Sequence, residues 1–217
     1  MPLKPTLIYV YDPLCGWCFG FHPVIEKIVT RFDERLNIEV KPGGLAIGDR
    51  AQPIGEGYSY IIDSTKQVEN TTGAEFGRNF KLLAEEGSYL YDSEPSCLAQ
   101  LAMNRLEPES SLQFAGDMQN ALFVEGKSLN EWSTFDELLN SYSVDNKSFK
   151  KLWSSDELKQ EMHKEFAWCK KAGATGFPTL LLQIGDEISR MARGYRPYDV
   201  IESHLHHLIN NIEKMSS

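Results

Sequence analysis

Apolar and polar residues alternate near the two ends of the chain but follow a helical period through its middle. Residues 6–12 form a short run of branched and aromatic residues, and residues 38–40 alternate before a Pro-Gly-Gly turn, so both segments are predicted to be strands. A helix is predicted between them, from near Cys15 to about Arg35. Its apolar positions at helical spacing are Phe21, Val24, Ile25, Ile28 and Phe32.

From about residue 47 to residue 173 the pattern is mostly helical, and glycines and polar clusters separate the segments. Strands return at residues 178–184 and 188–192, and the short link Gly185-Asp186-Glu187 predicts a hairpin. Pro197 then opens a final helix, whose apolar stripe is Ile201, Leu205, Leu208 and Ile212. The helices predicted in the middle are residues 59–69, 74–85, 95–106, 112–123, 134–141 and 155–172.

This order of elements predicts an α/β layer structure that is interrupted by a helical block. The two outer pieces are each too small to bury a core, so we expect residues 1–46 and 174–217 to form one discontinuous domain. Residues 47–173 would then be a helical insertion domain. A right-handed crossover predicts that the first two strands run parallel.

Composition fits a globular protein and argues against two classes of partner. The 217 residues are 41% hydrophobic, enough for one substantial core with a large insertion. The net charge of -9 disfavours non-specific binding to nucleic acid and docking on an anionic membrane. No segment approaches the ~20 apolar residues of a membrane span, and the first apolar run is too short for a signal peptide. We therefore expect a cytoplasmic protein; a processed periplasmic protein stays open.

The candidate chemistry lies in Cys15-Gly16-Trp17-Cys18, directly after the first strand and at the start of a helix. Two intervening residues bring both sulfurs within disulfide reach. Unpaired N–H groups and the positive end of the helix dipole favour a thiolate at Cys15, and the thiolate is the nucleophile in disulfide exchange. Cys18, one turn further, is expected to be more buried and to resolve the mixed disulfide.

A Cys-x-x-Cys pair is also half of a zinc site, but zinc requires four ligands. No second pair exists, and Cys97, Cys169 and the five histidines show no ligand spacing, so we expect no metal and no cofactor beyond the redox-active disulfide. Cys97 and Cys169 are interpreted as buried structural thiols, with a place near the site as the alternative for Cys97. A solvated helix face is the interpretation for His204, His206 and His207.

The residues around this pair resemble the DsbA family of thioredoxin-like proteins, in particular its cytoplasmic FrnE-like members. The matching segments are residues 11–18 with Pro23, then 93–97, 121–127, 138–139 and 173–179. The resemblance implies a thioredoxin-like fold with a large all-helical insertion that caps the site. It also implies a cis Phe177–Pro178 bond against the active site. We expect Gly16, Trp17, Phe177 and Pro178 to contact substrate, with shielding of the cysteines as the alternative for Trp17.

One position departs from the family pattern. The family carries a buried acid on the first strand, at the position that Tyr9 occupies here. The proton relay attributed to that acid therefore has no counterpart at this position, and the second proton must leave by water or through another group. Asp12 is near in sequence.

The first functional hypothesis is a dithiol–disulfide exchange enzyme acting on protein or small-molecule thiols and disulfides, with a separate recycling partner. Glutathione stays open as a co-substrate, and in the cytosol reductase or isomerase activity is more natural than bulk oxidation. The alternative is a glutathione-dependent isomerase or transferase, of the kappa-class or hydroxychromene carboxylate isomerase type. Those proteins usually have serine where Cys15 stands and lack the second cysteine. A non-catalytic role in holding a partner is the third hypothesis.

The aromatic residues of the helical block allow two interpretations. They belong to its core, or they line a groove for apolar peptide. They are Tyr58, Tyr60, Phe76, Phe80 and Tyr89.

Overall fold

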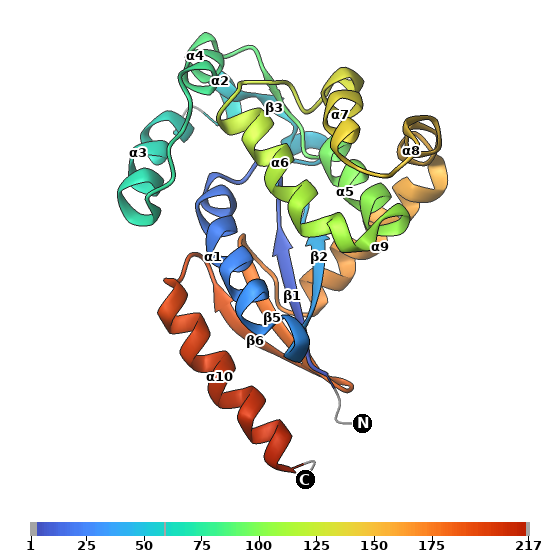
Figure 1. Cartoon of the computed structure of the whole chain (residues 1–217). Helices are drawn as coiled ribbons and strands as arrows, with labels where there is room; N and C mark the ends of the chain where they lie inside the picture. The colour runs from blue at the N-terminus through green and yellow to red at the C-terminus, as the bar shows by residue number, and fades with distance from the viewer. Residues whose placement is uncertain (1–3, 59, 216–217) are drawn as a thin grey trace.

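The computed structural model describes residues 4–58 and 60–215, and its centre is a four-stranded sheet (Figure 1). The strand order is β2-β1-β5-β6. β1 and β2 pair in parallel, as predicted, and the other two pairings are antiparallel. The strands are β1 (Thr6–Tyr11), β2 (Asn37–Pro42), β5 (Thr179–Ile184) and β6 (Glu187–Arg193).

Both faces of the sheet are covered, because alternate residues of the strands point to opposite sides. Leu7, Tyr9 and Tyr11 lie in a core with helices α1 (Gly16–Phe32) and α10 (Tyr198–Met215). Ile8 and Val10 face the other side and pack with Cys169 of α9 (Asp156–Lys171). These five β1 side chains are fully buried, and only Thr6 at the start of the strand is half-buried. The strand that leads to the cysteine pair is therefore fixed from both sides.

The last helix begins one residue later than predicted, at Tyr198, so Pro197 precedes it instead of occupying its first turn. Ile201 and Leu205 are buried, as the stripe predicts. Ile209 completes the buried face, while Leu208 is half-buried at its border. The side chain of Ile212 lies outside the described residues.

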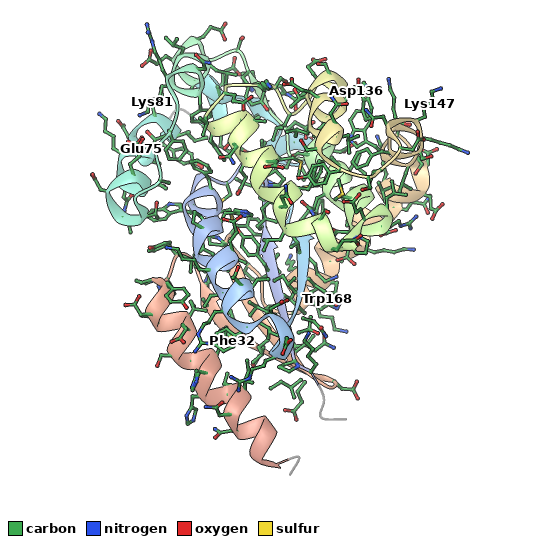
Figure 2. All side chains as sticks on the ribbon, viewed as in Figure 1. Phe32, Glu75, Lys81, Asp136, Lys147 and Trp168 are labelled. Carbon is green, nitrogen blue, oxygen red and sulfur yellow. The ribbon has the colours of Figure 1, made fainter. Side chains whose placement is uncertain are left out.

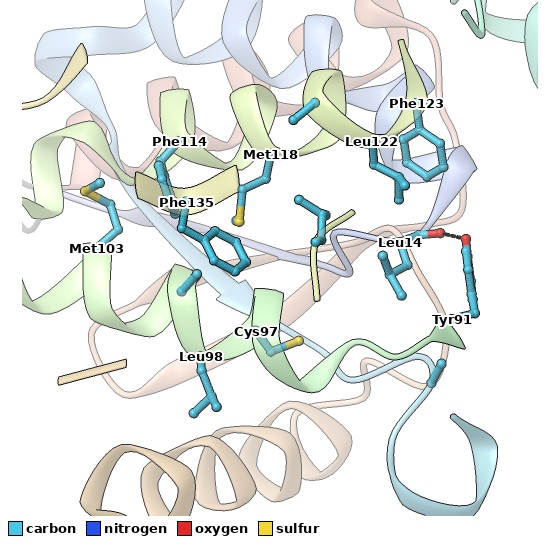
Figure 3. Packing of buried hydrophobic residues seen from close by; sticks show 14 of the residues in the cluster. Leu14, Tyr91, Cys97, Leu98, Met103, Phe114, Met118, Leu122, Phe123 and Phe135 are labelled. Carbon is cyan, nitrogen blue, oxygen red and sulfur yellow. Dashed lines mark hydrogen bonds between the residues drawn. The ribbon is translucent and has the colours of Figure 1, made fainter. Parts of the chain in front are cut away.

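The helices between β2 and β5 form a block with a hydrophobic cluster of its own (Figure 3). The predicted helices are present with ends shifted by a few residues. The structure adds α2, α8 and a short antiparallel pair of strands, β3 (Gln52–Pro53) and β4 (Leu90–Tyr91), which the sequence pattern did not predict. The helices are α2 (Ile54–Gly57), α3 (Ile61–Thr72), α4 (Arg78–Glu86), α5 (Glu94–Leu106), α6 (Ser111–Phe123), α7 (Trp132–Leu138) and α8 (Asn146–Trp153). Single 3-10 turns lie at Asp33–Arg35, Gly48–Arg50, Pro108–Ser110 and Leu139–Ser141.

The helical block is joined to the sheet unit beside the start of α1. α1 packs against α3 and α6, and Leu14, just before the first cysteine, lies in the hydrophobic cluster of the block. The Tyr91 hydroxyl donates a hydrogen bond to the Leu14 carbonyl, drawn as a dashed line in Figure 3. The loop carrying the cysteines is thus anchored in the insertion.

The outer surface of the block is charged. Figure 2 shows Glu75, Asp136 and Lys147 pointing outward, and all three are exposed. Over the part of the chain that the structure describes, no helix combines the length and apolar character needed to cross a bilayer.

Candidate active site

The cysteine pair lies at the junction of β1 and α1. Cys15 is the N-cap residue of α1, with an extended backbone, and its N–H donates to the Asp12 carbonyl at 3.0 Å. This turn places the Cys15 sulfur at the helix N-terminus, where the first N–H groups lack helical partners. Cys15 is 8% exposed and Cys18 is fully buried, which confirms the predicted order of burial.

The segment before β5 reaches the first cysteine. The Phe177–Pro178 bond is cis, as the family resemblance implies, and the Cys15 thiol lies 3.8 Å from the Phe177 carbonyl oxygen. Gly43 makes this approach possible, because a Cβ atom there would lie only 1.9 Å from the Phe177 ring. The sequence predicted Gly43 only as part of a turn. Its second role depends on Phe177, which is far away in the chain.

Asp12 is fully buried and connects three segments. Its Oδ1 accepts hydrogen bonds from the Leu14 N–H at 2.9 Å and the Ser93 hydroxyl at 3.0 Å. Its Oδ2 accepts from the Leu45 N–H at 2.6 Å and lies 3.9 Å from the Cys97 thiol. Burial raises the pKa of the Asp12 carboxyl, although the donors from Leu45 and Leu14 act in the opposite direction. Asp12 therefore holds the cysteine loop to the loop after β2 and to α5.

Cys97 satisfies both interpretations given to it, since it is fully buried and also contacts the Asp12 carboxylate. Burial raises the pKa of its thiol well above the ordinary value. Cys169 is 2% exposed and lies at the far face of the sheet, where burial raises its pKa to about 12.

The second cysteine lies in a closed environment. Burial raises the pKa of the Cys18 thiol well above its ordinary value, and a hydrogen bond with Cys15 raises it further. The Tyr9 hydroxyl donates to the Cys18 carbonyl at 3.2 Å. The position that carries an acid in the family thus holds a buried phenol, which lies directly beside Cys18.

A pocket of about 210 Å³ opens beside Cys15 between the sheet unit and α3. Gly16, Trp17 and Phe177 line it together with Cys15, whereas Pro178 is buried and does not line it. Its other walls are mostly apolar and are formed by Leu14, Leu45, Tyr60, Ile61, Ser64, Thr65, Val68, Phe76, Tyr91 and Phe123.

Some of the aromatic residues of the helical block line the pocket, and others belong to the core of the block. Phe76 and the 58% exposed Tyr60 line the pocket. Phe80 and Tyr89 are buried in the core of the block, and Tyr58 packs against it. A larger hollow of about 720 Å³ follows the outer edge of β2, but none of the predicted site residues lines it. The smaller pocket is therefore the candidate substrate site.

The histidines of α10 are exposed, and His206 and His207 contact Asn210 and Asn211. Within residues 4–58 and 60–215, no group of three or more His, Cys, Asp or Glu residues is arranged to hold a metal ion.

Several solved structures share this fold. A protein from Nitrosomonas europaea, named for a suggested protein disulfide isomerase activity, has a crystal structure that matches with a TM-score of 0.84 at 28% identity, covering 96% of this chain and 98% of that one. Cytosolic disulfide reductase DsbM from Pseudomonas aeruginosa matches with a TM-score of 0.76 at 24% identity, covering 95% and 99%. A second DsbM structure contains GSH, with a TM-score of 0.73 at 24% identity, covering 94% and 99%.

Among curated proteins, the ClpXP adapter protein SpxH of Bacillus subtilis (strain 168) is 24% identical over 221 residues, covering 99% of this chain and 71% of SpxH. The model of the DSBA-like thioredoxin domain matches residues 6–206. The predicted fold class, a thioredoxin-like α/β fold with a helical insertion, is confirmed. Because the family model matches nearly the whole chain, this protein belongs to the DSBA-like thioredoxin domain family.

Proposed function

We propose that this protein is a thiol–disulfide exchange enzyme in which Cys15 is the nucleophile and Cys18 the resolving thiol. One observation carries the proposal. Cys15 is the more exposed cysteine and lies at the helix N-terminus beside the Phe177 carbonyl, while Cys18 is buried in the first turn behind it.

The exchange follows from this arrangement. The Cys15 thiolate attacks a substrate disulfide, one substrate sulfur leaves, and a mixed disulfide forms. Cys18 then attacks the Cys15 sulfur and releases the second substrate thiol. The oxidised enzyme runs the same steps in reverse and passes its disulfide to a substrate dithiol.

Substrate contacts are assigned to the residues around the pocket. Gly16, Trp17 and Phe177 line it, and Pro178 follows the Phe177 carbonyl and directly precedes β5. The mostly apolar walls fit an apolar group next to the reacting sulfur of the substrate.

The direction of exchange and the location in the cell are also proposals. DsbM is named as a cytosolic disulfide reductase and has a structure with GSH. Its similarity to this chain supports a cytoplasmic reductase or isomerase with glutathione as a co-substrate. A separate partner would recycle the disulfide form, because structural disulfides are scarce in the cytosol and net oxidation there is unfavourable.

The test uses the full chain and the variants Cys15→Ser and Cys18→Ser. The wild-type protein is equilibrated in glutathione redox buffers to measure the Cys15–Cys18 potential, and is assayed for insulin reduction and for refolding of scrambled ribonuclease. Cys15→Ser should abolish all activities, whereas Cys18→Ser should form a mixed disulfide and fail to release it.

Three outcomes contradict the proposal. Failure of Cys15 and Cys18 to form a disulfide in any buffer removes the resolving step. Glutathione-dependent turnover that survives Cys18→Ala favours the isomerase or transferase alternative. A cellular role unaffected by Cys15→Ser favours a non-catalytic role, and adapter function in SpxH gives that outcome a precedent.

A further inference from the structure

The hydroxyl of Tyr9 is directed at Cys18 from the adjacent strand. It donates to the Cys18 carbonyl at 3.2 Å. Burial, the nearby Cys18 thiol and a hydrogen bond with that side chain raise the pKa of the Tyr9 hydroxyl. Both side chains are completely buried, so water does not compete for this contact. Because a phenol proton rotates about the C–O bond, the hydroxyl can redirect its hydrogen bond from the carbonyl to the sulfur.

The position of this hydroxyl is fixed by the packing of its ring. The Tyr9 ring stacks on Tyr11 with centroids 5.3 Å apart, and meets Phe21 edge-on at 6.1 Å. The hydroxyl is therefore held beside Cys18 before any reaction begins. Preorganised donors of this kind act without a reorganisation cost.

The groups beside the Cys18 sulfur determine how readily it takes a negative charge. Cys15, Asp12, Tyr9 and Tyr11 interact electrostatically with it. The Asp12 carboxylate opposes a negative charge on Cys18, whereas the Asp12 backbone N–H favours it. Tyr9 and this N–H are thus two neutral donors beside Cys18.

We propose that Tyr9 is a positioning and charge-stabilising residue that donates a hydrogen bond to the Cys18 sulfur while Cys18 displaces the substrate. The inference rests on the proposed roles of Cys15 and Cys18. In this step the Cys18 sulfur bonds to the Cys15 sulfur, and the bond from Cys15 to the substrate sulfur breaks with its electron pair on the substrate. One proton leaves Cys18 and one is taken up by the released thiol, so no outside oxidant or reductant is needed.

Tyr9 does not act as the base in this step. Burial raises the pKa of Tyr9 well above the ordinary value, so its hydroxyl keeps its proton. A neutral donor stabilises the anion on Cys18 without adding a second negative charge to a buried site. That distinguishes Tyr9 from a carboxylate at the same position.

The test follows the reaction of the reduced protein with 5,5′-dithiobis(2-nitrobenzoate) by stopped flow from about pH 6 to about pH 11. The first release of chromophore reports attack by Cys15, and the second reports displacement by Cys18. Tyr9→Phe should slow the second phase about 10- to 100-fold and move its pH midpoint upward by about one to two units, since a hydrogen bond to a charged group is lost. The first phase should stay within about threefold of wild type.

Tyr11→Phe is the matched control, because Tyr11 is equally buried on the same strand and donates to the Gln100 side chain at 2.5 Å. A second phase in Tyr9→Phe that matches Tyr11→Phe in rate and midpoint overturns the inference. A wild-type protein without a first phase that depends on Cys15 overturns the proposed function, and this inference with it.

A fluorinated tyrosine at position 9 keeps the ring and strengthens the hydrogen-bond donor, which covers the case of a Tyr9→Phe protein that does not fold. It should accelerate the second phase and lower its midpoint. An unchanged second phase contradicts the role of Tyr9.

Discussion

At the scale of single residues, Asp12 joins the cysteine loop to two other segments of the chain. Four donors from three segments meet its carboxylate, which is fully buried. A buried carboxylate is costly unless its oxygens are hydrogen-bonded, and this requirement fixes the loop that presents Cys15. Asp12 thus connects the turn before Cys15 to both the sheet unit and the insertion.

Asp12→Asn should lower the free energy of unfolding by about 2–3 kcal/mol, because the amide NH2 faces N–H donors that the carboxylate accepted. The folded pKa of Asp12 is raised, so the native state binds the proton more tightly than the unfolded chain does. Its contribution to stability therefore decreases as the pH rises from the ordinary aspartate value through the raised folded value. The difference in the free energy of unfolding between wild type and Asp12→Asn, measured by urea titration, should narrow as the pH rises across that window. Ser93→Ala removes a donor that lowers the Asp12 pKa, so its pH-dependent loss of stability should extend to higher pH than in wild type. A difference in unfolding free energy between wild type and Asp12→Asn that stays constant with pH would contradict the raised pKa.

Gly43→Ala tests whether the position of Phe177 matters for activity. The new Cβ would lie 1.9 Å from the Phe177 ring, so the ring and the carbonyl near Cys15 must move. Insulin reduction should fall about 10- to 100-fold, the size expected for a misplaced reacting group. In the control Gly176→Ala the added Cβ meets Arg193 at an ordinary 3.4 Å. Equal activity in the two variants would show that the exact position of Phe177 is not required for activity.

At the scale of elements, helix ends are set by local groups that can be tested separately from the site. The Ser155 hydroxyl caps α9 by accepting from the Leu158 N–H at 3.2 Å. Ser155→Ala should cost about 1 kcal/mol of stability in urea unfolding. The neighbouring Ser154 donates to the Lys150 carbonyl instead, so Ser154→Ala should cost clearly less. Equal losses would argue against a capping role.

Periodicity predicted the elements that bury a regular stripe or alternate on a sheet. α1 and β1 were found within a few residues, because their buried positions recur at the expected spacing. α8 was missed because its eight residues bury only Phe149 completely. The β3–β4 pair was missed because two-residue strands, one of them containing Pro53, show no alternation.

The features of the candidate site also fall into those that the sequence could predict and those that it could not. The cysteine pair is local in sequence and could be predicted, and the cis Phe177–Pro178 bond followed from a family motif. The contacts of Asp12 with Leu45 and Ser93, and that of Gly43 with Phe177, join positions far apart in the chain. Such contacts depend on tertiary packing, which leaves no periodic signal in a single sequence.

At the scale of the whole molecule, the pocket beside Cys15 exists because two hydrophobic clusters meet there. The sheet unit contributes Cys15 and Phe177, and the insertion contributes α3 and Phe76. If Cys15 is the nucleophile, as proposed, the insertion shapes which substrates reach a sulfur that belongs to the sheet unit. Size selection should then reside in the insertion, and reactivity at the start of α1.

Ser64→Trp separates these two properties. Ser64 is half-buried on α3 and lines the pocket, so a large ring there should fill the space without overpacking the core. The KM for a peptide disulfide with apolar flanking residues should rise about tenfold, the usual scale for altered contacts in an apolar pocket. The rate with glutathione disulfide, which carries no apolar side chain, should change little. Lys66→Trp, on the exposed part of the same helix, should leave both substrates unaffected. If Ser64→Trp slows both substrates equally, the pocket controls access to Cys15 and does not select the substrate.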